Sequence, residues 1–164
     1  MTTSLVRTRQ ACADDVAAVL ELYGRCSPQT LELRFHVPVT TVPERLVRDL
    51  VQSPEGWSVV AEQAEEVIGH GCAGRLSASR VEIGLLVDDA FQGTGVGTRM
   101  LRDLATSAVE RGYTTMMCSV APDNASVLPT VRRAGLEGLT TYVDGVLEIE
   151  ICLEAGSAAL RQPA

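Results

Sequence analysis

The chain lacks lysine: all 14 basic residues among its 164 residues are arginines. It has no Cys-x-x-Cys pair, and its five scattered cysteines argue against a disulfide framework or a zinc site and predict a reducing, cytoplasmic setting. No stretch approaches the ~18 consecutive apolar residues of a membrane span, and the N-terminus does not have the pattern of a secretory signal. We therefore expect neither a membrane nor a metal as a partner.

Negative charge predominates, with 21 acidic residues, 14 basic residues and a net charge of −7. Nucleic acids are bound by neutralising their phosphates with Lys and Arg, so this balance argues against a nucleic-acid partner. An acidic surface favours the approach of a cationic substrate such as an amine. The length fits one domain with its own hydrophobic core.

Hydrophobic periodicity predicts helices in the first third of the chain and short strands after it. Ser27-Pro28 and Pro43 are typical helix starts, and Asp144-Gly145 is a preferred hairpin turn. Helices are expected over 14–26, from Ser27-Pro28 onward, and over 43–51, 95–111 and 124–134. Strands are expected over 5–9, 57–61, 67–73, 81–87, 114–120, 139–143 and 147–153, with turns at 65–66 and 77–79. This order predicts one α+β domain.

The most informative segment is the loop Gln92-Gly93-Thr94-Gly95-Val96-Gly97, which joins the strand 81–87 to the helix 95–111. Glycine permits positive φ and lets a ligand approach the backbone closely. The first amides of a helix lack internal acceptors, and the helix dipole favours negative charge there. A diphosphate is the natural occupant. The alternative is a glycine-rich turn of purely structural use.

Two common phosphate-binding motifs do not match this loop. The P-loop of nucleotide hydrolases ends in Gly-Lys-Ser/Thr, and the chain has no lysine. The dinucleotide motif G-x-G-x-x-G would need glycine at position 98 or 100, where Thr98 and Met100 stand. Nucleotide hydrolysis and dinucleotide binding are therefore disfavoured.

The pattern that fits is Q-x-x-G-x-G, formed by Gln92, Gly95 and Gly97 between a strand and a long helix, with Asn124 after the next strand. With these residues and this order of elements, from about Val6 to Leu153, the chain resembles the GNAT superfamily of acyl-CoA-dependent N-acyltransferases. The resemblance implies acetyl-CoA as co-substrate.

The same resemblance implies an α+β, GNAT-like fold, in which a mixed, mostly antiparallel sheet of about six to seven strands is flanked by helices. It also implies a single N-acetyltransferase domain over residues 1–154, followed by a flexible C-terminal tail over 155–164.

In the family, the loop amides bind the pyrophosphate of the coenzyme and the strand before the loop hydrogen-bonds the pantetheine arm. An asparagine after the next strand approaches the pantetheine. Carried over to this chain, the coenzyme-binding residues are Leu85, Leu86, Val87, Gln92, Gly93, Thr94, Gly95, Val96, Gly97, Thr98 and Asn124. Asn124 is equally suited to be a helix N-cap.

A narrower resemblance, to bacterial Pat-type protein lysine acetyltransferases, rests on Glu82, ten positions before Gln92, and on the stretch from Ser27 to Phe35. In that group a strand glutamate at this spacing is the general base, which takes the proton that an ammonium must lose before it attacks a thioester. We expect Glu82 to be partly buried beside Gly84, whose missing side chain leaves room for substrate. The alternative is a solvated glutamate on an exposed strand face.

The remaining catalytic roles are less fully represented in the sequence. The resemblance implies that a backbone amide on a strand bulge stabilises the oxyanion, and Leu86 is the expected donor. Many family members protonate the leaving thiolate with a tyrosine, but Val131 stands at that position; Tyr113 and Tyr142 are the candidate substitutes. A thiol with a pKa near ~8.5 leaves reasonably well without such an acid.

The sequence therefore predicts transfer of an acetyl or short acyl group from acyl-CoA to a primary amine, by direct attack in a ternary complex. Cys118 has no evident histidine partner and is expected to be a core thiol, not a nucleophile. A protein lysine and a small amine both stay open as acceptors. The resemblance implies that the N-terminal helices and the final hairpin shape the acceptor cleft, here roughly residues 24–42 and 142–148; Arg34, Phe35, His36 and Asp144 lie there, and each is equally suited to be a packing or surface residue. The alternative function is a non-catalytic acyl-CoA-binding sensor. A homodimer through the hairpin 139–153 is a further expectation.

Overall fold

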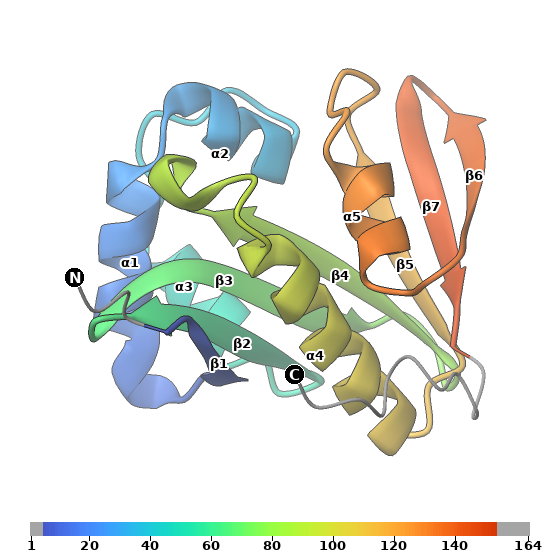
Figure 1. Cartoon of the computed structure of the whole chain (residues 1–164), viewed down its shortest axis with the longest axis horizontal. Helices are drawn as coiled ribbons and strands as arrows, with labels where there is room; N and C mark the ends of the chain where they lie inside the picture. Colours follow the sequence, from blue (N-terminus) through green and yellow to red (C-terminus); the bar gives the residue numbers. More distant parts are fainter. Residues whose placement is uncertain (1–4, 154–164) are drawn as a thin grey trace.

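The computed structural model describes residues 5–153. The end of the predicted domain and the predicted tail over 155–164 lie outside the described residues. Within residues 5–153 the strands form one seven-stranded sheet in the order β1-β2-β3-β4-β5-β7-β6 (Figure 1). The strands are β1 (Arg7–Gln10), β2 (Gly56–Gln63), β3 (Glu66–Arg75), β4 (Arg80–Val87), β5 (Thr115–Val120), β6 (Gly138–Val143) and β7 (Val146–Cys152).

The helices lie mostly where the periodicity predicts them. They are α1 (Val16–Arg25), α2 (Pro28–Phe35), α3 (Glu44–Val51), α4 (Val96–Glu110) and α5 (Val127–Arg133), with short 3-10 helices η1 (Ala13–Asp15) and η2 (Asp89–Phe91). Ser27 caps α2, since its side chain accepts a hydrogen bond from the Thr30 amide. Gly112, with a φ of 84°, ends α4 as expected.

Most predicted boundaries differ from the structure by one to three residues, and two of these differences have a local explanation. The turn before β3 lies at Ala64 and Glu65, which both have positive φ, so it precedes the predicted turn at 65–66 by one residue. The fifth helix begins at Val127 and not at Asn124, because a turn with a hydrogen bond from the Asn124 amide to the Ala121 carbonyl comes first.

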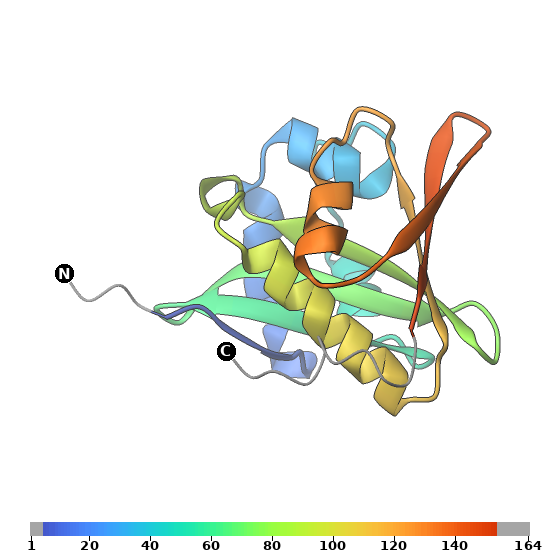
Figure 2. The ribbon, with the colours of Figure 1, turned by 45° about the vertical axis from the view of Figure 1, so that its right-hand side comes forward.

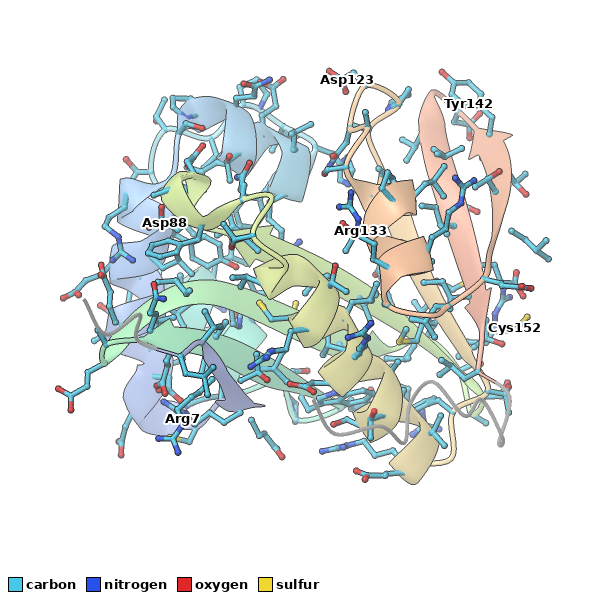
Figure 3. All side chains as sticks on the ribbon, viewed as in Figure 1. Arg7, Asp88, Asp123, Arg133, Tyr142 and Cys152 are labelled. Atoms are coloured by element: carbon cyan, nitrogen blue, oxygen red, sulfur yellow. The ribbon has the colours of Figure 1, made fainter. Side chains whose placement is uncertain are left out.

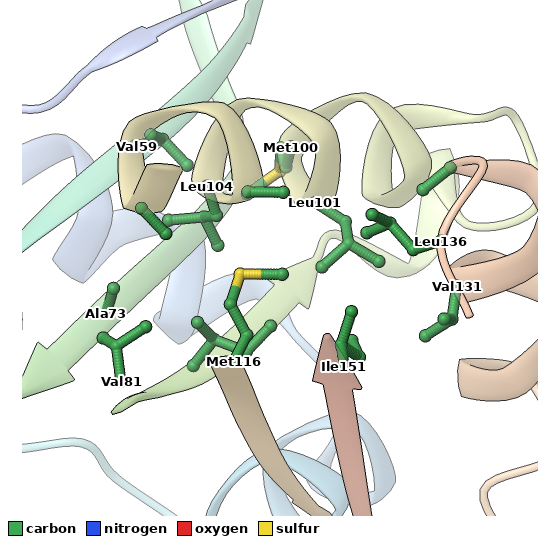
Figure 4. Close-up of a cluster of buried hydrophobic side chains, with 14 of the residues drawn as sticks. Val59, Ala73, Val81, Met100, Leu101, Leu104, Met116, Val131, Leu136 and Ile151 are labelled. Carbon is green, nitrogen blue, oxygen red and sulfur yellow. The ribbon is translucent and has the colours of Figure 1, made fainter. Parts of the chain in front are cut away.

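The predicted fold class is confirmed. All neighbouring strands pair antiparallel except β4 and β5, which are parallel. Helices α1 and α3 pack on one face of the sheet and α4 on the other, with α5 beside α4 (Figure 1). Two hydrophobic clusters result. The larger includes Met100 and Leu104 of α4 and Met116 of β5 (Figure 4). The smaller lies beneath α1, α2 and α3.

The feature that positions the site is the divergence of β4 from β5. These strands pair only at Arg80↔Thr115, Val81↔Met116 and Glu82↔Met117, whereas β3 continues to pair with β4 as far as Val87. Beyond Glu82 the two strands move apart, as Figures 1 and 2 both show. The backbone of β4 is therefore left with an open edge toward β5.

Candidate functional site

A cavity of about 660 Å³ occupies the space between the diverging strands. Its walls include β4, the glycine loop and α4 on one side, and β5 and α5 on the other. It extends past the sheet to α2, where Arg34 and His36 line it. Ten of the predicted site residues line this cavity: Glu82, Leu85, Leu86, Val87, Gln92, Gly93, Gly95, Gly97, Thr98 and Asn124.

The glycine loop leaves several backbone donors unpaired. Gly93 and Gly95 have φ values of 74° and 93°, which residues other than glycine rarely adopt. Gly95 is the N-cap of α4 and provides no side-chain acceptor. Within residues 5–153 the amides of Val96, Gly97 and Thr98 have no backbone or side-chain acceptor. These three donors, at the positive end of a 15-residue helix, form a site for an anion.

Two predicted loop residues contribute no side chain to the cavity. Val96 is buried in the core, and the Thr94 hydroxyl donates to the Phe91 carbonyl at 2.6 Å. The side chain of Gln92 is also occupied, since its Nε2 donates to Thr30 Oγ1 and to the Val87 carbonyl, both at 3.1 Å. Gln92 therefore braces the loop against β4 and α2.

Asp89 makes a second connection between this loop and α2. Its carboxylate accepts hydrogen bonds from the Ser27 amide at 2.9 Å, the Ser27 hydroxyl at 2.7 Å and the Thr30 hydroxyl at 2.9 Å. Burial alone would raise the pKa of Asp89, but the donors from Ser27 and Thr30 outweigh it and the pKa is lowered. The carboxylate thus stays charged and holds α2 over the loop.

The open edge of β4 carries the amides of Leu85 and Val87. The Leu76 amide bonds to the Arg80 carbonyl and the Asp88 amide to the Ile68 carbonyl, so the even-numbered residues of β4 form the hydrogen-bonded pairs with β3. The register between them is unbroken, so the bulge expected at Leu86 is not found, and the Leu86 amide faces His70 of β3. The amides of the odd-numbered residues point toward β5. Leu85 and Val87 lie beyond the last β4–β5 pair, Glu82↔Met117, so their amides have no partner on β5.

Glu82 lies on the face of β4 opposite the α4 core, as the strand alternation predicts. Its side chain is exposed, not partly buried, and it forms no ion pair within the described chain. The expected desolvation of Glu82 is therefore absent. The carboxylate is reachable from the cavity and from solvent.

The space above Gly84 is filled, which corrects the expectation that it is left for substrate. The Arg34 guanidinium occupies it: a Cβ at Gly84 would lie 2.6 Å from Arg34 Cζ. Arg34 Nη2 donates to Cys72 Sγ at 3.1 Å on the neighbouring strand. Arg34 belongs to the segment 24–42 that was expected to shape the acceptor cleft, although no role was assigned to it, whereas Cys72 was not among the predicted site residues. The sequence feature that could have indicated this contact is Gly84, which lies between Ile83 and Leu85 and has no side chain.

The opposite wall is formed by β5, α5 and the turn between them. Asn124 is not a helix N-cap, because α5 starts three residues later; its Oδ1 accepts from the Ser126 hydroxyl at 2.7 Å. Cys118 lines the cavity, and burial together with the nearby charge of Glu82 raises the pKa of its thiol to about 11. Cys118 is therefore protonated at neutral pH and is a poor nucleophile.

No tyrosine lies among the cavity-lining residues of the described chain. Val131, at the position that many family members give to tyrosine, lines the cavity and is 2% exposed. Tyr113 stacks on Trp57 with ring centroids 5.7 Å apart. Tyr142 lies at the tip of the β6–β7 hairpin and is 65% exposed (Figure 3). Neither is placed to protonate a group in the cavity.

Beneath the α2 end of the cavity lies a buried polar row. His70 is fully buried, with Nδ1 2.9 Å from the Tyr23 hydroxyl and Nε2 3.0 Å from the Ser58 hydroxyl. Burial, reinforced by the charge of Arg34, lowers the pKa of His70 to about 3. The imidazole is therefore neutral and serves packing and hydrogen bonding. At the surface, His36 Nε2 donates to the Ser119 carbonyl at 3.1 Å, which links α2 to β5.

Two structural features that would indicate a metal or a membrane are absent from residues 5–153. His, Cys, Asp and Glu side chains form no group of three or more that would hold a metal ion. No described helix has both the length and the apolar character needed to cross a membrane.

Comparison with known proteins places this site in a family. Residues 16–136 match the acetyltransferase (GNAT) family. The match covers more than half of the chain, so the chain belongs to this family.

Solved structures agree with this assignment. The GNAT domain of S. lividans PAT is similar to this chain with 25% identity and a TM-score of 0.83, over 90% of each chain. An N-acetyltransferase from Staphylococcus aureus Mu50 has 20% identity and a TM-score of 0.71, over 92% of this chain and 100% of that one. A phosphinothricin acetyltransferase from Sinorhizobium meliloti, in complex with AcCoA, has 20% identity and a TM-score of 0.72, over 97% and 93%.

Proposed function

We propose that this chain transfers an acetyl group from acetyl-CoA to a primary amine. The observation that carries the proposal is that one cavity joins three features: the unpaired amides at the start of α4, the open edge of β4, and the exposed carboxylate of Glu82. The first two suit the diphosphate and the amide-bearing arm of a coenzyme A. The third suits an amine that must lose a proton.

The coenzyme half of the site consists mainly of backbone. The amides from Gly95 to Thr98 would hold the pyrophosphate, because the helix dipole and the free N–H groups favour an anion there. Leu85 and Val87 would pair with the pantetheine through their open edge, much as a further strand would. Asn124 lines the other wall, where its amide group can contact the same arm.

In the acceptor half, Glu82 would take the proton from the ammonium, directly or through one water, since it is exposed to solvent. A backbone amide would stabilise the oxyanion. Because the Leu86 amide faces β3, we move this role to Leu85, the first open-edge amide after the segment of β4 that pairs with β5. Glu82 itself belongs to the paired segment and forms its last pair, with Met117 of β5.

Direct attack of the amine on the thioester fits these residues better than a covalent enzyme intermediate. The Cys118 thiol is protonated at neutral pH, with a pKa raised to about 11. Departure of the coenzyme as a thiolate needs no enzyme acid, because a thiol with a pKa near ~8.5 is a fair leaving group. The lack of a tyrosine among the described residues that line the cavity is thus compatible with turnover.

The proposal is tested by measuring free CoA release from acetyl-CoA with and without a panel of primary amines. Transfer predicts release that depends on the amine and equals the acetylated product. Release without an amine would indicate a hydrolase instead. Binding of acetyl-CoA without turnover on any amine would favour the sensor.

The homodimer stays a prediction. The edge strand β6 exposes Leu139, Tyr142 and Val143, which are 70%, 65% and 39% exposed. Light scattering during gel filtration measures the molecular mass, and a mass of one chain at micromolar concentration would contradict the prediction.

A further inference from the structure

Arg34 is an unusual residue for the position that it holds. It belongs to the last turn of α2, and its guanidinium lies flat against β4 in the volume that a side chain at position 84 would fill. A Cβ on Gly84 would be 2.7 Å from both Nη1 and Nη2. The Arg34 carbon Cζ also lies 5.3 Å from the centre of the Phe35 ring. The absence of a side chain at Gly84 is thus what admits this cation to the cavity wall.

Within residues 5–153 the charge of Arg34 has no ionic counterpart. No carboxylate of the described chain lies within 4.0 Å of it, and its Nε is buried without a hydrogen-bond partner. Its neighbours are the Cys72 thiol, the Phe35 ring and the Tyr23 hydroxyl. A guanidinium cannot lose its proton at accessible pH, and a partly buried charge without an ionic partner is unfavourable. An anion from outside the chain is therefore the expected partner.

An anion can reach Arg34 from the cavity, which Arg34 lines together with Cys72 and Glu82. Glu82 and Gly84 are two residues apart on one face of β4, which places their Cα atoms about 6.6–6.8 Å apart. Glu82 and Arg34 form no ion pair with each other, so both are available. The acceptor end of the cavity thus offers a carboxylate for an ammonium and, a few ångströms away, a guanidinium for an anion.

We propose that Arg34 forms a carboxylate-binding subsite and that the acceptor is a small zwitterionic amine, whose amine and carboxylate are a few bonds apart. This inference rests on the proposed acetyl transfer. The carboxylate forms a two-pronged hydrogen-bonded pair with the guanidinium. A lysine side chain within a protein has no carboxylate of its own at this distance, so it fits the subsite less well.

The reaction leaves this carboxylate unchanged. The ammonium gives one proton to Glu82, and the free amine attacks the thioester carbonyl carbon. A C–N bond forms and the C–S bond breaks, which releases the coenzyme thiolate. The nitrogen then loses its second proton; one of the two protons ends on the thiolate and the other in solvent. The products are an N-acetylated amino acid and CoA.

The test compares acids with neutral amides of the same shape. Acetylation of β-alanine and of 4-aminobutyrate is measured at saturating acetyl-CoA beside 3-aminopropanamide, 4-aminobutanamide and Nα-acetyl-lysinamide. We expect at least one acid to exceed its amide in kcat/KM by about 10- to 100-fold, mostly through a lower KM. This fold-change is the range expected for a hydrogen bond to a charged group. Arg34→Met should remove this preference, so that each acid and its amide are acetylated with similar kcat/KM.

Arg45→Met is the matched control, because Arg45 is exposed on α3 and does not line the cavity. This variant should keep the preference for acids. Three results would each overturn the subsite: equal rates on acids and amides, a preference for acids that survives Arg34→Met, or Nα-acetyl-lysinamide as the best acceptor.

Two measurements decide the matter without turnover. Titration calorimetry of N-acetyl-β-alanine and of its amide into the CoA-bound protein should show binding of the acid only, and none in Arg34→Met. If no amine is acetylated but this difference appears, the transfer proposal fails and the subsite stands. The thermal midpoint of the free protein should be equal or higher in Arg34→Met, since an unpaired buried charge is removed. A lower midpoint would contradict the proposal, because it would show that the protein itself compensates the charge.

Discussion

The two ends of the cavity offer different kinds of binding group to the proposed ligands. At the glycine loop the binding groups are backbone amides, held by the positive φ of Gly93 and Gly95 and by the start of α4. At the α2 end they are side chains from distant segments, Arg34 from α2 and Glu82 from β4. A backbone site depends on the conformation of one short segment. A side-chain site depends on how whole elements pack.

This difference separates what is general in the molecule from what is particular to it. Backbone amides recognise a pyrophosphate whatever side chains surround them, so the coenzyme end suits a substrate shared across the family. The acceptor end is decided by a few side chains, of which Arg34 is the most distinctive. Substitutions at the two ends should therefore affect different kinetic parameters.

The largest effect is expected from Glu82→Gln. The amide cannot take the proton of the ammonium, so kcat/KM for the amine should fall about 10²- to 10⁴-fold, while the dissociation constant of acetyl-CoA stays the same. Steady-state kinetics and calorimetry measure the two quantities. Glu66→Gln is the control, since Glu66 lies on β3 outside the cavity. Full activity in Glu82→Gln would exclude Glu82 as the base.

The polar row under Arg34 should make stability depend on pH. The pKa of His70 is about 3 in the folded protein, below its ordinary value of 6.5. The unfolded chain therefore binds a proton first as the pH falls, and stability is lost from about pH 6.5 downward. Between pH 7 and pH 5 this loss is about 2 kcal/mol.

Urea unfolding at both pH values measures this dependence. His70→Gln should reduce the loss of stability between pH 7 and pH 5 by about 2 kcal/mol. His36→Gln, at the exposed histidine, should leave this loss in place. The same pH dependence in His70→Gln and in the original chain would show that His70 is not held neutral.

The smallest effect is expected from Gly95→Ala. Alanine at a φ of 93° is disfavoured by about 1–2 kcal/mol, which corresponds to an acetyl-CoA affinity about 5- to 30-fold weaker. Gly112→Ala is the matched control, since Gly112 has a φ of 84° at the far end of α4. It should lower stability without changing the affinity. Equal affinities in both variants would remove the distinction between the two ends of the cavity.

The same distinction explains how much could be predicted from the sequence. The strands, the helices and the glycine loop follow from local periodicity and local backbone preference, and most were predicted within a few residues. Arg34 was expected to lie near the acceptor cleft, but its contact with Gly84 was not predicted, because that contact depends on how α2 packs on β4, fifty residues away. The expected bulge at Leu86 depended on the register with β3, for which the sequence has no local signal. The exposure of Glu82 likewise depends on which neighbours cover that end of β4.

Positions 34 and 84 share one volume, although they are far apart in the sequence. Any side chain at 84 displaces the guanidinium, and any shorter side chain at 34 opens a space above 84. The two positions are therefore energetically coupled, and their double-mutant cycle should be non-additive. A side chain at 84 therefore requires the guanidinium, the far end of a flexible side chain, to move out of this volume or the arginine to be replaced.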